Sequence, residues 1–376
     1  MSSLAHLKSA GLDRVRYLGD LIRWDEWYNS KIPLVFLCIY YAALCRPELG
    51  AFFVLGETAR LLAVIIVYAS FGFLVNSYSD RQVDVEAGKP NPLAAMTETR
   101  ARLLVAVVAL VGLAGSFLLY LDRVSVFVVT VAAYLVAAAY SLAPVRLKER
   151  DLWGLVAGGL AQRTFPALIV FQAMAVWDAA SIAICCMLTM MGIRFMAIHQ
   201  AKDRESDLRA RVKTVATTRG VPFLKDLTNL VLLPLELIAL TLSLVFMARA
   251  FPALVVLVAF YIWLFLVKAR FPNEVRGQES IFSYSLFVGL YYVYWPLFLA
   301  LLLTWRDPAF VLLALVNVLW CFSLVKNAGL TIAAVATAFY ARFGKQLVRS
   351  PSDAQVAKAG EPPLPPASAA KAARPR

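Results

Sequence analysis

Residues 59–90 read ARLLAVIIVYASFGFLVNSYSDRQVDVEAGKP. The stretch opens with a long apolar run and passes without a turn signal into a segment that carries two aspartates. A helix that crosses a bilayer needs about 20 mostly apolar residues, so the apolar part predicts a membrane span, placed here at 58–79. The composition of the whole chain agrees, because 61% of its residues are hydrophobic and only 16% are charged. These figures exclude a soluble globular, a disordered or a disulfide-framework protein.

Apolar runs of similar length recur along most of the chain. The further candidate spans are 31–46, 101–121, 124–143, 152–176, 179–200, 226–249, 251–269 and 280–304. Another apolar stretch, 309–340, is interrupted by Lys326 and Asn327, and we expect it to be a tenth span or a span followed by an amphipathic helix on the membrane. The sequence therefore predicts an all-α, polytopic membrane helical bundle with about nine transmembrane helices and possibly a tenth.

The basic residues indicate how the bundle is oriented and divided. The net charge is +13, and Lys and Arg concentrate in the connections 80–100, 144–151, 201–225 and 268–279. Basic loops are typical of the cytoplasmic side, so we expect a multi-pass protein of the cell (inner) membrane with these loops in the cytoplasm and no nucleic-acid partner. Four parts are expected: a cytoplasmic amphipathic segment (1–30), a transmembrane domain (31–305), an extra apolar or amphipathic helical segment (306–349) and a disordered cytoplasmic tail (350–376).

A second apolar run also ends in a pair of aspartates, in FMAIHQAKDRESDLRARVKT at 195–214. Asn76, Asp80 and Asp84 are spaced by four residues, so on a continued helix they share one face. Asp203 and Asp207 repeat that spacing. One such pair at a helix end is usually a solvated surface, but two on the same side of a membrane protein favour a metal site. Mg²⁺ binds hard oxygen ligands together with substrate phosphates, so these five residues are the candidate metal ligands and the four aspartates the candidate catalytic residues.

Basic residues accompany both carboxylate segments in sequence. They would neutralise the oxygens of a diphosphate, and the candidates are Lys89, Arg146, Lys148, Arg204 and Lys213.

Three segments together resemble the UbiA superfamily of intramembrane prenyltransferases. Residues 76–84 (NSYSDRQVD) and 203–214 (DRESDLRARVKT) are similar to its two aspartate motifs, and 140–148 (YSLAPVRLK) is similar to its third conserved loop, which adds Tyr140 to the substrate-binding candidates. Ser77 replaces an aspartate common in the first motif, and Arg211 replaces a common glycine. The resemblance implies a nine-span bundle around a central cavity, with Mg²⁺ and an isoprenyl diphosphate at its cytoplasmic mouth.

The expected function is a Mg²⁺-dependent transfer of an isoprenyl group from its diphosphate to a small acceptor, with an aromatic or quinone precursor preferred. Two alternatives stay open at this point. A terpene cyclase of the same superfamily would ionise the diphosphate and close the cation on its own chain. A membrane transporter would explain the number of spans, but not two motifs of magnesium-binding type.

Polar groups within predicted spans are costly and therefore candidates for a function. Arg163, Arg194 and Glu236 lie inside such spans. Glu236 is expected either to pair with one of these arginines or to orient the acceptor. His199 precedes Asp203 by four residues and either orients it or lies at the interface, and Arg23 either contacts substrate or extends to the membrane surface.

Overall fold

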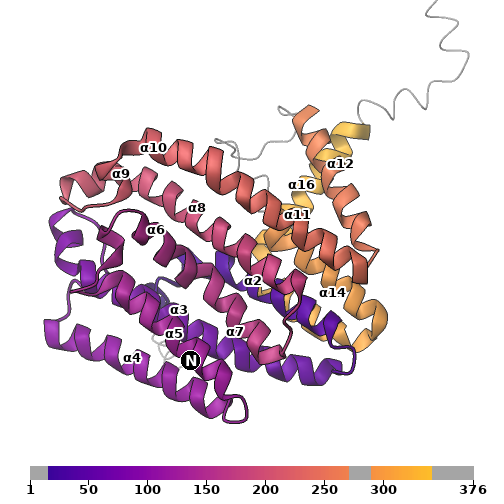
Figure 1. Ribbon diagram of the computed structural model, residues 1–376, viewed down its shortest axis with the longest axis horizontal. Helices are drawn as coiled ribbons and strands as arrows, with labels where there is room; N and C mark the ends of the chain where they lie inside the picture. The colour runs from indigo at the N-terminus through magenta and orange to yellow at the C-terminus, as the bar shows by residue number, and fades with distance from the viewer. Residues whose placement is uncertain (1–15, 271–288, 341–376) are drawn as a thin grey trace, which may run out of the picture.

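The structure is a computed structural model that describes residues 16–270 and 289–340. Within these ranges the chain folds into helices and contains no strand (Figure 1). The prediction of an all-α fold is therefore confirmed. The expected tail at 350–376, the first half of the expected N-terminal segment and the beginning of the expected span at 280–304 lie outside the described residues.

Seven helical stretches of the described chain are long and apolar enough to cross a membrane. They are α2 (Trp24–Cys45), α3 (Ala51–Glu86), α4 (Glu98–Leu119), α5 (Val124–Ser141), α6–η2–α7 (Leu152–Gly159, Leu160–Thr164, Phe165–Met174), α8 (Ala179–Arg209) and α10–η3–α11 (Gly220–Asp226, Leu227–Leu232, Leu233–Ala250). Shorter elements are η1 (Leu147–Glu149), α9 (Val215–Thr218), α12 (Leu254–Arg270), η4 (Leu290–Tyr294), α14 (Trp295–Arg306), η5 (Pro308–Phe310), α15 (Val311–Trp320) and α16 (Phe322–Phe339). The described ranges thus hold seven helical stretches that could span a membrane, or eight with the bent pair discussed next, and the expected count of nine is not confirmed.

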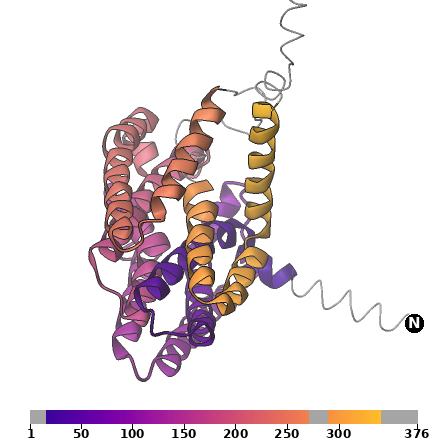
Figure 2. The ribbon, with the colours of Figure 1, turned by 90° about the vertical axis from the view of Figure 1, so that its right-hand side faces the viewer.

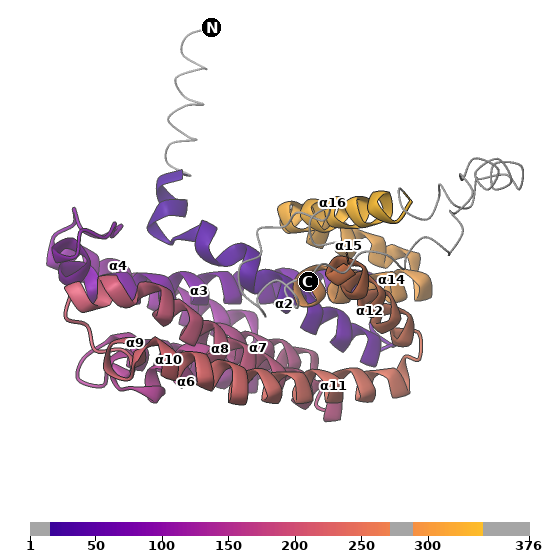
Figure 3. The same cartoon turned by 90° about the horizontal axis from the view of Figure 1, so that it is seen from above.

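The apolar stretch at 309–340 is divided in two. η5–α15 and α16 meet at an angle of 89° around Cys321, so together they form a broken span or a re-entrant loop. Figures 2 and 3 show α16 on the outer side of the C-terminal helices. There it packs against α12, α15 and η4.

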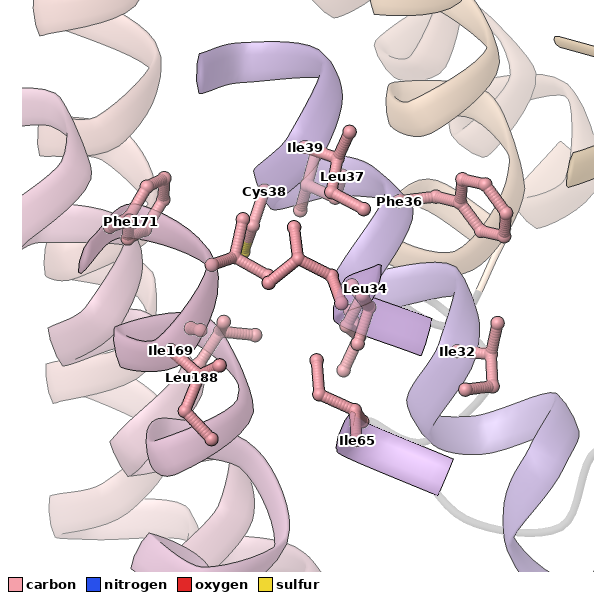
Figure 4. Close-up of a cluster of buried hydrophobic side chains, with 14 of the residues drawn as sticks. Ile32, Leu34, Phe36, Leu37, Cys38, Ile39, Ile65, Ile169, Phe171 and Leu188 are labelled. Carbon is pink, nitrogen blue, oxygen red and sulfur yellow. The ribbon is translucent and has the colours of Figure 1, made fainter. Parts of the chain in front are cut away.

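Helix α2 is the central element of the bundle. Buried residues make up 78% of its apolar window, against 17% for the peripheral helix α4. It packs against α7 on one side and against α14 and η4 on the other. In Figure 4, Leu34 and Cys38 of α2 lie toward Ile65 of α3, Ile169 and Phe171 of α7 and Leu188 of α8, whereas Ile32 and Phe36 point to the other side of the helix. The helices that carry the two aspartate motifs therefore share one core with α2.

Three of the helices contain a π-helical segment directly before a proline. The segments η2, η3 and η4 end two residues before Pro166, Pro234 and Pro296 respectively. A proline has no N–H and its ring clashes with the carbonyl four residues earlier, so the chain widens there by one residue. In η2, Phe165 N donates to the Leu160 carbonyl, and the Tyr68 hydroxyl donates to the Ala161 carbonyl at 2.7 Å. Tyr68 thus satisfies the carbonyl that Pro166 cannot reach with a hydrogen bond.

A pair of glycines brings two helices almost into backbone contact. A Cβ atom on Gly159 would lie 2.6 Å from the backbone nitrogen of Ile193, and one on Gly192 would lie 2.7 Å from the Gly159 carbonyl oxygen. No side chain fits in such a gap. The crossing fixes α8, which carries the second aspartate motif, against the end of α6 and η2.

Candidate active site

A hollow inside the bundle connects several of the helices that carry the predicted site. Its empty volume is about 810 Å³, part of it open to the surroundings. Helix α3 contributes one continuous face between Ile65 and Asn76, which corresponds to roughly 16 Å along a helix. Tyr140 of α5, Met196 and His199 of α8, and Arg23, near the start of α2, also line it. The cavity is therefore long, largely apolar, and bounded by Asn76 of the first motif.

The first aspartate motif lies on the last three turns of α3, which continues as a helix beyond the expected span. The ammonium group of Lys148 binds Asp80 Oδ1 at 2.6 Å, Asn76 Oδ1 at 3.0 Å and Ser79 Oγ at 2.7 Å. Arg146 Nη2 binds the same Asp80 oxygen at 3.2 Å. Lys148 is only 7% exposed, and burial lowers its pKa while the neighbouring Asp80 carboxylate opposes that shift. Two cations of the loop that follows α5, Arg146 and Lys148, thus bind the first motif.

The second motif is joined to the first by a single lysine. Lys89 follows α3, and its ammonium group lies 3.2 Å from Oδ1 of Asp207 on α8. The backbone N–H of Lys89 donates to the Asp84 carbonyl at 2.8 Å, and Asn91 Nδ2 donates to Asp84 Oδ2 at 2.8 Å. The loop at 89–91 is therefore held to the end of α3 while it reaches across to α8.

Other predicted residues lie outside this network. Asp203 is 3.5 Å from His199, and this pair is substantially exposed. Arg204 donates to the Ala216 carbonyl at 3.2 Å, so its guanidinium connects α8 to α9 by a hydrogen bond. Lys213 is exposed, and in the described part of the chain it has no ion pair with the candidate carboxylates.

The oxygen donors of the two motifs suit magnesium chemically, although they do not form a ready-made cage. Among the described residues no three His, Cys, Asp or Glu side chains are close enough to hold a metal ion by themselves. Mg²⁺ does not require such a group, because it keeps several waters and is usually bound by one or two carboxylates plus substrate phosphates. Asp80 and Asp207 are instead neutralised by Lys148, Arg146 and Lys89. The same cations are suited to bind diphosphate oxygens, so the site fits an ion that arrives with a diphosphate.

Two of the charged residues inside the spans, Arg194 and Glu236, form an ion pair with each other. Arg194 binds Glu236 through Nε at 2.6 Å and Nη2 at 2.8 Å, and both side chains are fully buried. The hydroxyl of Tyr291 donates to Glu236 at 3.0 Å. This arrangement confirms the prediction that Glu236 pairs with an arginine, since a bidentate pair compensates two buried charges.

Two polar residues of the cavity wall were not predicted as site residues. Lys31 is 7% exposed and donates to Oε1 of Gln162 at 3.1 Å. The sequence placed Lys31 at the first position of the span 31–46, where a lysine normally extends to the membrane surface. Helix α2 in fact begins at Trp24, so Lys31 is two turns inside it. Nothing in the sequence indicated that Gln162 lines the cavity, because the direction of its side chain depends on the π-helical segment η2.

Comparison with known proteins places these observations in a family. The model of the UbiA prenyltransferase family matches residues 34–287. Among solved structures, a UbiA homolog from Archaeoglobus fulgidus bound to GPP and Mg²⁺ has a TM-score of 0.50 and 17% identity, covering 82% of this chain and 99% of that chain. The same homolog bound to DMAPP and Mg²⁺ has a TM-score of 0.49 at 17% identity, with the same coverage. The likeness to the homolog bound to GPP shows a shared fold. A search of curated proteins found no match to the sequence.

Proposed function

Since this chain belongs to the UbiA prenyltransferase family, we propose that it transfers an isoprenyl group from a prenyl diphosphate to a small aromatic or quinone-precursor acceptor, with Mg²⁺ as cofactor. The observation that carries the proposal is the cluster formed by Lys148 with Asn76 and Asp80 beside the long apolar cavity. An anion-binding end and an apolar body match the two halves of a prenyl diphosphate. The basic loops around this end support a position at the cytoplasmic face.

Each part of the site has a distinct task in this reaction. Bound Mg²⁺, held by oxygens of the two motifs, would stabilise the negative charge that develops on the departing diphosphate. The metal ligands proposed are Asn76, Asp80, Asp84, Asp203 and Asp207. Lys148, Arg146 and Lys89 are proposed to neutralise diphosphate oxygens, with Arg204 and Lys213 as further proposed contacts. The aromatic side chains of the wall, Tyr68, Phe73 and Tyr140, shield an allylic cation from water and stabilise its charge.

The proposal is tested by removing one carboxylate from each motif. We expect Asp80→Ala and Asp207→Ala to lower Mg²⁺-dependent pyrophosphate release from geranyl diphosphate by about 10²-fold or more, on the scale of ~3 kcal/mol for one key electrostatic contact. The matched control is Glu205→Ala, because Glu205 is an exposed acid between the two aspartates of the second motif. Full activity of either aspartate variant at unchanged protein level would contradict the assignment.

The products of the wild-type enzyme separate transfer from cyclisation. A prenyltransferase releases pyrophosphate and forms an adduct with the acceptor, whereas a cyclase converts geranyl diphosphate alone into a cyclic hydrocarbon or alcohol. We expect adduct formation with phenolic acceptors. Cyclic products without an acceptor would instead support the cyclase.

A further inference from the structure

An ion pair links two segments that lie at the same end of the bundle as the aspartate motifs. One is the post-α5 loop (142–151), and the other is the post-α8 segment (210–219). The Asp151 carboxylate accepts a hydrogen bond from Nε of Arg219 at 3.0 Å and a second one from its Nη2. In the described part of the chain, no other side-chain hydrogen bond or ion pair joins these two segments. The pair therefore connects the loop that carries Lys148 to the segment that carries Lys213.

The conformation of Asp151 shows that its carboxylate has no role in capping α6. Asp151 directly precedes α6, where an aspartate normally accepts a hydrogen bond from an N–H of the first turn, but its side chain makes no such bond. Its backbone has φ 51° and ψ −131°, a conformation that residues other than glycine rarely adopt. Backbone strain of this kind persists where the surrounding structure enforces it, and it clusters at functional sites. Here the carboxylate is directed to Arg219 instead of the helix.

Arg219 is held in place for this contact from its own side. Its guanidinium lies over the ring of Phe223, 4.9 Å from the centroid. At the start of α9, the N–H of Val215 donates to Oε1 of Gln200 on α8 at 3.1 Å. The position of Arg219 therefore follows that of α8, the helix that carries the second motif.

The position of Asp151 is coupled in the same way to Lys148. A Cβ atom on Gly154, in the first turn of α6, would lie 2.9 Å from the Lys148 carbonyl oxygen, so α6 packs directly on the backbone of this lysine. The N–H of Gly154 also donates to the Asp151 carbonyl at 3.0 Å. Movement of Asp151 would therefore shift Lys148, whose ammonium group binds Asp80 of the first motif at 2.6 Å.

The bridge that Lys89 forms to Asp207 cannot keep the two motifs at a fixed distance during the reaction. Lys89 is a proposed contact of the diphosphate, and Asp207 is a proposed metal ligand, so each acquires a new partner when the donor and Mg²⁺ bind. Asp151 and Arg219 do not belong to the proposed ligand set. Their pair can therefore persist while the substrate is bound.

We propose that Asp151 and Arg219 are a positioning pair, which fixes the spacing of the post-α5 loop and the post-α8 segment so that cations of both bind one diphosphate. This proposal rests on the proposed function, because it takes the diphosphate as the group that the two segments share. The two side chains are 39% and 44% exposed, and an exposed ion pair contributes little to stability. Loss of the pair should therefore affect donor binding more than folding.

The test measures how geranyl diphosphate with Mg²⁺ raises the melting temperature of the purified full-length protein in detergent. We expect Arg219→Gln and Asp151→Asn each to raise the concentration needed for half of the shift about five- to tenfold, within the range of couplings between residues of one network. The double variant should be no weaker than either single variant, because the two residues act as a unit. Arg219→Lys, which keeps the charge, should recover part of the loss.

A glycine variant separates the carboxylate of Asp151 from its backbone. Glycine adopts a positive φ without strain, so Asp151→Gly should fold, but it lacks the carboxylate and should bind the donor as weakly as Asp151→Asn. The matched control is Glu48→Gln, which removes an exposed ion pair with Arg46 in the connection between α2 and α3. This control should bind like the wild type, and the melting temperatures without ligand should stay close to the wild-type value in all variants.

Each contrary result has a definite meaning. An unchanged half-maximal concentration in Arg219→Gln and Asp151→Asn would overturn the proposal, and so would losses that simply add in the double variant. Wild-type binding by Asp151→Gly would also overturn it, because the backbone conformation and not the ion pair would then position the loop. A wild type that fails to respond to geranyl diphosphate would contradict the proposed function itself.

Discussion

Lys148 and Lys213 were predicted to have the same role, but their burial and contacts in the structure differ. Both were predicted to bind the diphosphate, because each accompanies the carboxylate segments in sequence or loop position. Lys148 is buried against Asn76, Ser79 and Asp80, whereas Lys213 is exposed on the segment before α9. The sequence reveals which residue types are available, but the reach of a lysine depends on how the loop around it folds. Lys31 was missed for the related reason that its depth depends on where α2 begins.

The difference between these lysines leads to a prediction. We expect Lys148→Met to raise the KM for the prenyl diphosphate and to lower kcat, with kcat/KM reduced by about 10²-fold, because a buried cation that contacts the leaving group acts most strongly in the transition state. Lys213→Met should reduce kcat/KM by less than tenfold. Steady-state pyrophosphate release at several donor concentrations measures both effects. A larger loss in Lys213→Met would show that the segment before α9 closes over the bound donor.

At the scale of helices, the sequence predicted which segments are apolar better than how each helix is built. The expected spans 58–79 and 179–200 correspond to α3 and α8, and both helices continue into their aspartate motifs. The π-helical segments could not be located, because Pro166, Pro234 and Pro296 lie inside expected spans and a proline there does not by itself distinguish a π-helical turn from a kink. The glycine contact between α6 and α8 was also invisible, since it depends on a crossing point that one sequence does not reveal.

That glycine contact can be tested by adding one methyl group. We expect Gly192→Ala to lower the free energy of unfolding by about 1–3 kcal/mol, because the new Cβ would meet the backbone carbonyl of Gly159, which cannot rotate away. Gly56→Ala is the matched control: Gly56 is exposed on α3 and its Cβ would meet no atom within 4 Å. In that open helical position alanine should be neutral or stabilising by up to about 1 kcal/mol. Thermal unfolding in detergent compares the variants, and equal melting temperatures would show that the two helices can separate without cost.

At the scale of the whole molecule, the membrane class, the helical architecture and the family were all predicted, whereas the expected count of nine spans is not confirmed. The expected spans 251–269 and 280–304 border residues 271–288, which lie outside the described ranges, and the possible tenth span at 309–340 forms two helices that meet at 89°. The candidate metal ligands are confined to residues 76–207, within α3 and α8. The C-terminal helices α14 and α15 pack on α2 and α3 respectively, so they support the bundle that forms the cavity without supplying these ligands.

Because the C-terminal segments supply none of the proposed ligands, we can predict how the enzyme responds to truncation. Removing residues 351–376 should leave Mg²⁺-dependent transfer in liposomes within about twofold, because every proposed ligand lies far upstream. The basic residues Lys358, Lys371, Arg374 and Arg376 would attract anionic lipid at roughly 1 kcal/mol each, an effect that salt screens. A truncation that also removes α16 should be less stable, because Val335 of α16 is fully buried against a cluster that contains Leu264 of α12. If the short truncation loses activity at both low and high salt, the proposed boundary near residue 350 is wrong, since a purely electrostatic contribution of the tail would already be absent at high salt.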